Sequence, residues 1–295
     1  MNKPLTFSLI GGDLRQLYAA SLLAADGHKV RIYGFGNSTP SNKSIYIATS
    51  VKDCTETADV VILPMPYSIS GGNIINSPLT SELINTNEII SSTPQNRQIF
   101  AGKVDSFLFE LCRNNQLSCI DYSKREELAI MNAIPTAEGA LSIALSNTPY
   151  TLRGSKCLVI GYGRIGKILS KILQSLGAFV TPTARKYSDL ATIYANGFEP
   201  IHTNSLEKNI SKYDIIFNTV PYKILDFKAL SATKNNVLII DLASIPGGVD
   251  FETANKLNRK TIQALSLPGK FAPETAGKII KDTIINILEE SEVQI

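Results

Sequence analysis

Three glycines at positions 161, 163 and 166 have the spacing of a turn that binds the phosphates of a dinucleotide. The apolar run 157–160 precedes them, and an amphipathic helical pattern with apolar residues at 165, 168, 169, 172, 173 and 176 follows. In such a turn Gly161 allows the tight bend, Gly163 lets backbone amides approach a diphosphate, and Gly166 lets helix and strand pack closely. The start of the helix adds free N–H groups and a positive dipole end. We therefore predict that segment 161–166, which includes Tyr162, binds a dinucleotide.

The residues after the next predicted strand distinguish between the two nicotinamide cofactors. Sites for NAD place Asp or Glu there, and its carboxylate accepts a hydrogen bond from the ribose 2′-hydroxyl. This chain instead reads Thr183-Ala184-Arg185-Lys186, with two cations and no carboxylate. Because cations suit a 2′-phosphate, we predict NADP, held by Arg185 and Lys186. NAD, with the two cations in a solvated loop, is the alternative.

Three further loops follow predicted strands of the same block. They are Asn218-Thr219-Val220-Pro221, segment 243–248 with Ser244, and Leu267-Pro268-Gly269-Lys270. Ligands of open α/β sheets bind outside the carboxyl ends of the strands. Small residues and prolines in these loops would let the backbone come near a ribose or a nicotinamide, although each loop could also be a plain turn. We predict that Thr219, Val220 and Pro221 contact the cofactor.

Strand and helix patterns alternate in two blocks of the chain. The first block has apolar runs at 7–10, 30–33 and 60–63, and the second has them at 157–160, 179–181, 215–217 and 237–240. Strand–helix–strand order produces parallel sheets, so we predict an α/β fold with two doubly wound parallel-sheet domains joined by helices. The N-terminal, flavodoxin- or Rossmann-like domain is expected over 1–134 and the nucleotide-binding Rossmann domain over 135–272. The last helical pattern, 273–295, is long enough to pack back on the first domain.

Two helix starts carry polar residues of interest. A helical pattern begins near Pro135, with Thr136 as its expected N-cap and Glu138 in its first turn. In the first block, Gly11-Gly12-Asp13 leads into a helix with Arg15 in its first turn. The third glycine is missing there, so we expect no second nucleotide. Arg15 could bind a carboxylate with help from the helix amides, or lie on the surface as an ordinary helix residue.

The composition excludes several classes of protein. With 44% apolar and 19% charged residues among 295, the chain is neither disordered nor a coiled coil. A net charge of +3 is too small to argue for nucleic acid or a membrane surface as partner. Two histidines and no CxxC pair argue against a metal site. No apolar run approaches the length of a membrane span and the start lacks a secretory signal, so we expect a cytoplasmic protein.

Five longer segments carry a resemblance to a known family. They are IGGDLRQL at 10–17, NAIPTAEGA at 132–140, NTPYTLRGSKCLVIGYGRIG at 147–166, DLASIPGGVDF at 241–251 and LPGKFAPETAGKI at 267–279. Together they make the chain resemble the family of dipicolinate synthase A subunits from spore-forming bacteria over nearly its whole length.

The resemblance assigns roles to particular positions. The nucleotide loop of the family falls on Gly161, Gly163, Arg164, Ile165 and Gly166. The region around Pro268, Gly269 and Thr275 also resembles the loop of methylenetetrahydrofolate dehydrogenases that borders the nicotinamide. By that resemblance the substrate would lie in the cleft between the two domains.

The resemblance also implies an activity. It is the oxidation of a dihydrodipicolinate-type precursor to dipicolinate in the mother cell during sporulation, together with the flavoprotein-like B subunit of the synthase. NADP would accept a hydride from the ring while a base takes a proton from the neighbouring carbon. The two carboxylates of such a substrate need anion ligands, for which Arg15, Thr136 and Ser244 are the candidates. Glu138 is the candidate base or orienting group, and complementing the helix dipole is its alternative role.

Two other functions stay open. The chain could bind NADP and the flavoprotein-like B subunit without catalysis of its own, its active site being completed by that partner. It could also be a stand-alone reductase of the shikimate or methylenetetrahydrofolate dehydrogenase type. Those enzymes use a catalytic lysine in the first domain, where Lys43, Lys52 and Lys103 lie without a recognisable motif. A homo-oligomer is compatible with each of these functions, and neither nucleic acid nor a membrane is expected as partner.

Overall fold

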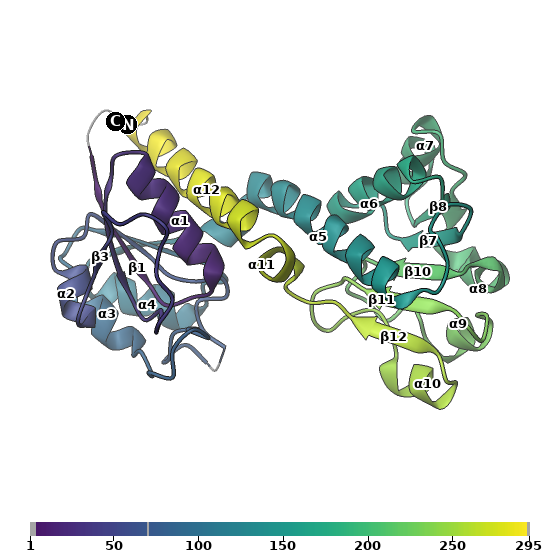
Figure 1. Cartoon of the computed structure of the whole chain (residues 1–295), viewed down its shortest axis with the longest axis horizontal. Coiled ribbons are helices and arrows are strands. Elements are labelled where there is room, and N and C mark those ends of the chain that lie inside the picture. Colours follow the sequence, from purple (N-terminus) through teal and green to yellow (C-terminus); the bar gives the residue numbers. More distant parts are fainter. Residues whose placement is uncertain (1–3, 70, 294–295) are drawn as a thin grey trace. The chain divides into compact units, whose positions relative to one another are not determined.

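The computed structural model describes residues 4–69 and 71–293 and divides the chain into two compact units (Figure 1). One unit contains the residues up to Met131 together with those from Ala272 onward, and the other runs from Asn132 to Phe271. Residues 1–3, 70, 294 and 295, which the sequence assigns to the first domain and its last helix, lie outside the described residues. Each unit is built on a parallel sheet with helices on both faces, which confirms the predicted fold class.

The first unit has a six-stranded parallel sheet in the order β3-β2-β1-β4-β5-β6. The strands are β1 (Thr6–Ile10), β2 (Lys29–Tyr33), β3 (Tyr46–Ile47), β4 (Val60–Ile62), β5 (Gln98–Ala101) and β6 (Ser118–Asp121). The strand order reverses at β1, which pairs with both β2 and β4. In open α/β sheets this reversal marks the edge at which ligands bind.

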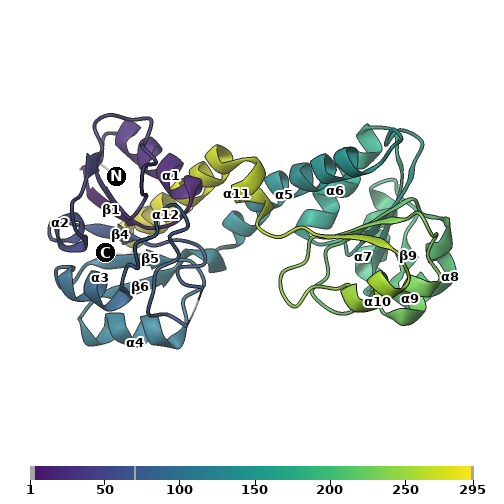
Figure 2. The ribbon, with the colours of Figure 1, turned by 60° about the horizontal axis from the view of Figure 1, so that its bottom comes forward.

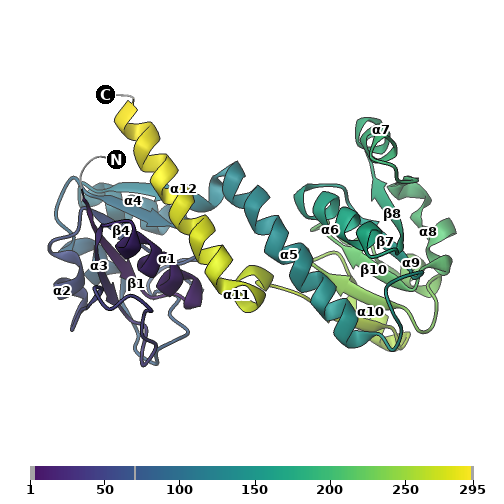
Figure 3. The same cartoon turned by 45° about the horizontal axis from the view of Figure 1, so that its top comes forward.

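Helices cover both faces of this sheet (Figure 2). On one face α1 (Leu14–Ala25) and α12 (Pro273–Val293) bury Leu23 and Ile284 against Phe7 of β1. On the other face α2 (Val51–Thr55), α3 (Thr86–Ser92) and α4 (Ser106–Asn114) bury Ile89 and Leu108 in a second core. A 3-10 turn, Tyr122–Lys124, follows β6. Helix α12 lies alongside α1, although more than 200 residues separate them in the sequence (Figures 1 and 3).

The second unit repeats the topology of the first. Its parallel sheet has the order β12-β11-β10-β7-β8-β9, so counting from its own first strand, β7, gives the order found in the first unit. The strands are β7 (Lys156–Ile160), β8 (Phe179–Ala184), β9 (Ile201–His202), β10 (Ile215–Asn218), β11 (Leu238–Asp241) and β12 (Lys260–Gln263). The helices that begin in this unit are α6 (Arg164–Ser175), α7 (Tyr187–Ala195), α8 (Leu206–Asn209), α9 (Phe227–Ser231), α10 (Phe251–Lys256) and α11 (Leu267–Phe271), with 3-10 turns at Thr203–Ser205 and Ile210–Lys212.

Helix α5 (Glu126–Asn147) begins nine residues before the predicted start at Pro135. Proline inside a helix is unfavourable because it cannot donate a hydrogen bond to the preceding turn. Burial outweighs that cost here, since Ala137, Ala140 and Ala144 are fully buried in the core of the second unit. The predicted N-cap role of Thr136 is therefore wrong: Thr136 lies within the helix, and its hydroxyl donates to the Asn132 carbonyl at 2.7 Å.

The position of Glu138 changes with the start of the helix. It lies in the middle of α5 rather than in its first turn, so the helix dipole does not explain its presence.

Helix α5 is also long and apolar enough to cross a membrane. Its buried alanine face identifies it as a core helix of this α/β fold.

Candidate nucleotide-binding site

The turn between β7 and α6 has the backbone geometry that its glycine spacing predicts. Gly161 has a φ of +95°, and a Cβ added there would lie 2.5 Å from Thr219 Oγ1. A Cβ on Gly166 would lie 2.1 Å from the carbonyl oxygen of Gly161, so the first turn of α6 packs directly against the backbone that follows β7. Gly163 differs, because a Cβ there would meet no described atom within 4 Å. The first and third glycines are thus required by packing, and the second leaves space above the turn.

The start of α6 is not capped by a side chain. Its N-cap residue is Gly163, and no side-chain hydrogen bond to the first turn is found among the described residues. Several other helices have such caps: Asp13 accepts from the Arg15 N–H at the start of α1, and Asp250 accepts from the Thr253 N–H at the start of α10. The starts of α7 and α8 resemble that of α6 in having none within the described part of the chain. An uncapped helix start presents N–H donors and a positive dipole end, which suits a phosphate group.

A cavity of about 420 Å³ lies beside this turn, at the carboxyl ends of β7, β8 and β10. Its lining joins the turn 161–163 to Arg185 and Lys186 after β8, and to segment 219–221 after β10. The structure therefore brings together three of the segments that the sequence assigns to cofactor binding, whereas Pro268, Gly269 and Thr275 are not in the lining.

Four residues of the cavity wall, Lys167, Asp189, Thr203 and Ile224, are not predicted from the sequence. Among these four residues, only Lys167 could have been found from the sequence, because it directly follows the third glycine of the turn. The exposed cations Lys167, Arg185 and Lys186 face one carboxylate, Asp189, so the lining carries an excess of positive charge. The ring of His202 lies 3.0 Å from the Arg185 carbonyl oxygen through Nε2, which supports the backbone that presents Arg185.

Tyr162 forms a buried floor beneath the turn. Its ring packs edge-to-face against Phe198 and lies 5.9 Å from the Lys167 Nζ. Burial raises the pKa of the Tyr162 hydroxyl, which stays a neutral donor at physiological pH. That hydroxyl has no hydrogen-bond partner within residues 4–69 and 71–293.

Two buried polar residues, Asn218 and Asp241, hold the loops at the ends of β10 and β11. Asp241 is fully buried and accepts from Asn218 Nδ2 at 2.8 Å and from the Gly248 N–H at 2.9 Å. Asn218 Nδ2 also donates to the Val220 carbonyl at 3.0 Å. This pair fixes segment 219–221, which lines the cavity, and segment 243–248. Both residues end buried apolar strands, and a polar residue at that position is the sequence signal that could have found them.

Several predicted residues are not part of the lining of this cavity. Ser244 is exposed in the loop after β11, and Glu138 is exposed on α5. Pro268 and Gly269 do not form the predicted loop, because they lie within α11, which follows Ser266 with its positive φ of 59°. Thr275 is exposed in the first turn of α12 and belongs to the first unit. Within the turn itself, Arg164 and Ile165 begin α6, and neither lines the cavity.

Arg15 is already paired in the first unit. Its Nε and Nη2 lie 2.9 Å from the two carboxylate oxygens of Asp13, and Nη2 also donates to the Met65 carbonyl at 2.9 Å. Arg15 is buried at the carboxyl ends of the neighbouring strands β1 and β4. Its guanidinium is thus held in a fixed orientation by Asp13.

A Rossmann-type sheet with a glycine turn, an uncapped helix start and a cationic cavity defines a nicotinamide-dinucleotide-binding unit of the dehydrogenase class. Residues 137–265 match the family model of the NAD binding domain of D-isomer specific 2-hydroxyacid dehydrogenases. Residues 6–123 match the model of the N-terminal domain of the dipicolinate synthase A subunit. The chain belongs to the family of dipicolinate synthase A subunits.

Named relatives cover almost the whole chain. The dipicolinate synthase A subunit of Bacillus subtilis is 32% identical over 258 residues, which are 88% of this chain and 87% of the relative. The crystal structure of the dipicolinate synthase A chain from Bacillus subtilis has a TM-score of 0.88 at 31% identity and covers 100% of this chain and 99% of that chain. The crystal structure of the A subunit from Bacillus halodurans has a TM-score of 0.86 at 30% identity, over 96% of this chain and 97% of that chain.

Proposed function

We propose that this protein oxidises a dihydrodipicolinate-type precursor to dipicolinate with NADP, together with a flavoprotein-like partner, in the cytoplasm of the mother cell of a sporulating bacterium. Membership of the family of dipicolinate synthase A subunits supports the product. The single observation that carries the choice of cofactor is the position of Lys167, Arg185 and Lys186 around one cavity at the glycine turn.

The residues of the second unit fit the cofactor part by part. The start of α6, with the open space above Gly163, would hold the diphosphate. Arg185 and Lys186 would hold the 2′-phosphate by charge-assisted hydrogen bonds. Segment 219–221, fixed by Asn218 and Asp241, would border the ribose on the nicotinamide side. When bound, the nicotinamide supplies a hydride acceptor, and the protein contributes position and exclusion of water.

The substrate residues follow from the two carboxylates of the precursor. We propose Arg15 as a carboxylate ligand whose orientation is set by Asp13, and the exposed Ser244 hydroxyl as a hydrogen-bond donor. Glu138, exposed on α5, is the proposed proton acceptor. Thr136 would contribute only by exchanging the Asn132 carbonyl for a substrate oxygen, since its hydroxyl donates within the helix. Pro268, Gly269 and Thr275 keep their proposed place near the nicotinamide only through the family resemblance.

We also propose a division of labour. Residues 135–272 would form the cofactor domain, and residues 1–134 with the helix from 273 would form the substrate and partner domain. The role proposed for residues 1–134 rests on the match of residues 6–123 to the N-terminal domain of the dipicolinate synthase A subunit.

Cofactor choice is tested by titrating NADP and NAD against the wild type, Arg185→Ala and Asp189→Asn. Loss of one charge-assisted contact should weaken NADP binding by about 1.5–3 kcal/mol in Arg185→Ala and leave NAD binding unchanged. Asp189, the carboxylate of the cavity, is the residue that could accept from a free ribose 2′-hydroxyl. The matched control is Lys228→Ala, an exposed cation on α9 outside the cavity lining. Preference of the wild type for NAD, with weaker NAD binding in Asp189→Asn, would overturn the NADP assignment.

Catalysis by this chain is tested separately from cofactor binding. The purified chain is assayed with NADP and the dihydropyridine dicarboxylate, first by itself and then with the flavoprotein-like partner. Turnover by the chain without its partner supports the proposal. Binding of NADP without turnover until the partner is added would instead support a cofactor-binding protein whose active site the partner completes.

A further inference from the structure

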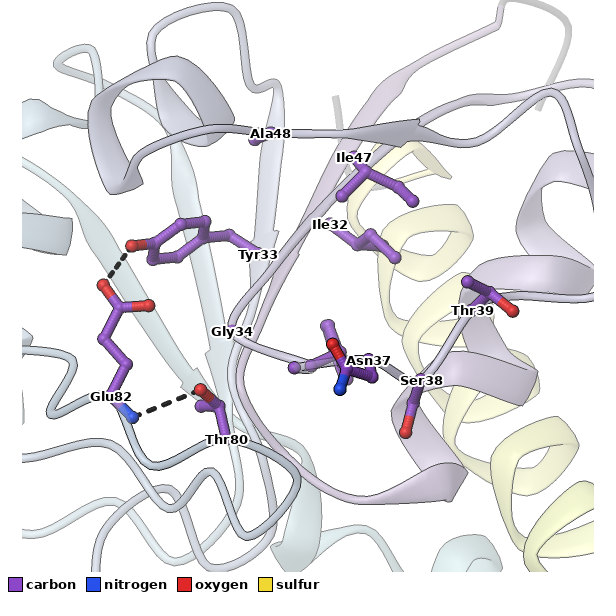
Figure 4. A pocket seen from close by; sticks show the side chains of 12 residues that line it. Ile32, Tyr33, Gly34, Asn37, Ser38, Thr39, Ile47, Ala48, Thr80 and Glu82 are labelled. Atoms are coloured by element: carbon purple, nitrogen blue, oxygen red, sulfur yellow. Dashed lines mark hydrogen bonds between the residues drawn. The ribbon is translucent and has the colours of Figure 1, made fainter.

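The first unit contains a second cavity, of about 430 Å³, at the carboxyl end of β2 (Figure 4). Its wall includes Tyr33 at the end of β2, the segment 34–39, Ile47 of β3, and Thr80 and Glu82 of the long connection before α3. The two sides of this wall are packed together, because a Cβ on Gly36, where φ is +57°, would lie 2.1 Å from the Leu79 carbonyl oxygen. Nothing in the proposed reaction uses this cavity.

Its place in the fold corresponds to that of the cavity in the second unit. The two sheets have the same strand order, and β2 and β8 are the second strands of their units. Each cavity lies at the carboxyl end of that second strand. In a Rossmann topology this is the place of the ribose next to the adenine, and an Asp or Glu there accepts from the ribose hydroxyls.

The phosphate position of the first unit is closed. The Gly12 N–H donates to the Asn76 carbonyl at 2.8 Å, and a Cβ on Gly11 would lie 2.6 Å from Ile75 Cγ2. The start of α1 is capped by the Asp13 carboxylate, which accepts the Arg15 N–H that a phosphate would otherwise bind. The cavity lining does not reach the turn after β1, whereas the cavity of the second unit includes its turn. A diphosphate therefore has no place beside this cavity.

The charge of the lining points the same way. Glu82 is the one charged residue among the described residues of the wall, so the cavity does not suit phosphates or dicarboxylates. The Tyr33 hydroxyl donates to Glu82 Oε1, and the Glu82 N–H donates to Thr80 Oγ1 at 3.2 Å (Figure 4). Burial and this hydrogen bond raise the pKa of Tyr33 to about 12, so Tyr33 remains a donor that orients the carboxylate. Across the cavity, Ile47 is 57% exposed and offers an apolar surface next to Ala48.

We propose that this cavity binds an uncharged ribonucleoside, with the ribose 2′- and 3′-hydroxyls donating to Glu82 and the base against Ile47 and Ala48. A carboxylate accepts two hydrogen bonds from a vicinal diol, and the apolar side chains cover the face of a flat ring. The proposal is independent of the function proposed above, because it concerns the first unit alone.

Calorimetric titration of the full chain with adenosine tests the proposal. Saturating NADP is present so that adenosine cannot enter the cavity of the second unit. We expect one saturable site and about tenfold weaker binding of 2′-deoxyadenosine, since the loss of one hydrogen bond to a carboxylate has an effect of this size. We expect no measurable binding of adenosine 5′-diphosphate, because the phosphate position of the first unit is closed. Glu82→Gln should weaken adenosine about tenfold and remove the preference for adenosine over its 2′-deoxy analogue. Glu110→Gln, an exposed carboxylate on α4, is the matched control and should bind like the wild type.

Three results would overturn the proposal. They are no heat with adenosine, equal affinity for adenosine in Glu82→Gln and the wild type, and binding of adenosine 5′-diphosphate as tight as that of adenosine. Thermal unfolding of Glu82→Gln shows that the variant is folded. Failure of NADP to bind would contradict the proposed function only, because the effect of Glu82→Gln on adenosine still reports on the first unit.

Discussion

In the glycine turn of the second unit, two glycines serve different purposes: one allows close packing of the backbone, and the other leaves space for a ligand. Gly166 is required by packing against the Gly161 carbonyl, and Gly163 stands over open space. The first controls how closely helix and strand approach, and the second controls how closely a ligand approaches the backbone. Substitution by alanine at the two positions should therefore change different measurable quantities.

Gly166→Ala should destabilise the second unit by about 1–3 kcal/mol, because its Cβ would lie 2.1 Å from a backbone oxygen and α6 must move away from β7. Gly163→Ala should lower the free energy of unfolding by no more than about 1 kcal/mol, since the added methyl group meets no described atom within 4 Å and only the preference of the N-cap position for glycine over alanine is lost. Its NADP affinity should fall, because the methyl group occupies the space proposed for the diphosphate. Urea unfolding and NADPH fluorescence titration measure the two effects. Wild-type affinity in Gly163→Ala would contradict the proposed phosphate site.

Residue positions can be predicted where one short segment determines the geometry. The glycine spacing and the cations after β8 lie in single segments, and the structure places Arg185 beside the turn. Asp189 and Thr203 reach the same cavity from α7 and from the turn after β9, and their position depends on how those elements pack. The position of the Arg15 side chain could not be predicted, because no sequence pattern reveals that Asp13 holds its guanidinium.

At the scale of elements, the sequence predicts most of the buried inner strands. It misses β5, although residues 99–101 are buried, and it misses strands at the sheet edges. Apolar runs mark β1, β4, β7, β10 and β11. Strands β6 and β12, which read Ser-Cys-Ile-Asp and Lys-Thr-Ile-Gln, lie at sheet edges and are only partly buried, so their patterns are weak. The sequence predicts a start of α5 at Pro135 because proline normally marks a helix boundary. The actual start lies at Glu126, and Leu128 in the first turn of α5 is buried in a core of the first unit.

The contact between α12 and α1 gives a prediction in which two effects have opposite signs. Alanine favours a helix over glycine by about 1 kcal/mol, so Gly277→Ala would stabilise an isolated α12. In the protein, the added Cβ would lie 2.5 Å from the Arg15 carbonyl oxygen and 2.8 Å from Tyr18 Cβ. We expect the clash to dominate and the first unit to lose about 1–3 kcal/mol of stability in urea unfolding.

The control for this helix is Lys278→Ala, which removes an exposed side chain paired with Asp282 on the next turn of α12. It should change stability by less than about 0.5 kcal/mol. An increase in stability in Gly277→Ala would show that α12 moves away from α1 without loss of packing.

At the scale of the whole molecule, each unit has its own hydrophobic cores. The cores of the first unit include Phe7 and Ile284 on one face of the sheet, and Val61 and Ile99 on the other. The second unit has separate cores. Cofactor binding should therefore stabilise the units unequally.

NADP at about 100 times its dissociation constant should stabilise the second unit by about 2.7 kcal/mol and leave the first nearly unchanged. Hydrogen exchange followed by mass spectrometry measures both in one experiment. Exchange at the amides of β7, β8 and β10 should slow, and exchange in β1 and β4 should not. Equal slowing of hydrogen exchange in both units would show that their stabilities are coupled. This result would contradict the expectation from their separate cores.

The return of α12 to the first unit has a consequence for synthesis on the ribosome. The sheet of that unit is translated first, but the helix that covers one face with α1 comes from residues 273–293, near the C-terminal end of the sequence. The apolar face of that sheet therefore stays partly uncovered while the nucleotide-binding unit is synthesised and folds. Ribosome-bound chains that stop before residue 273 should therefore attract chaperones through the uncovered face, and the first unit reaches its native state only after the second unit has been synthesised.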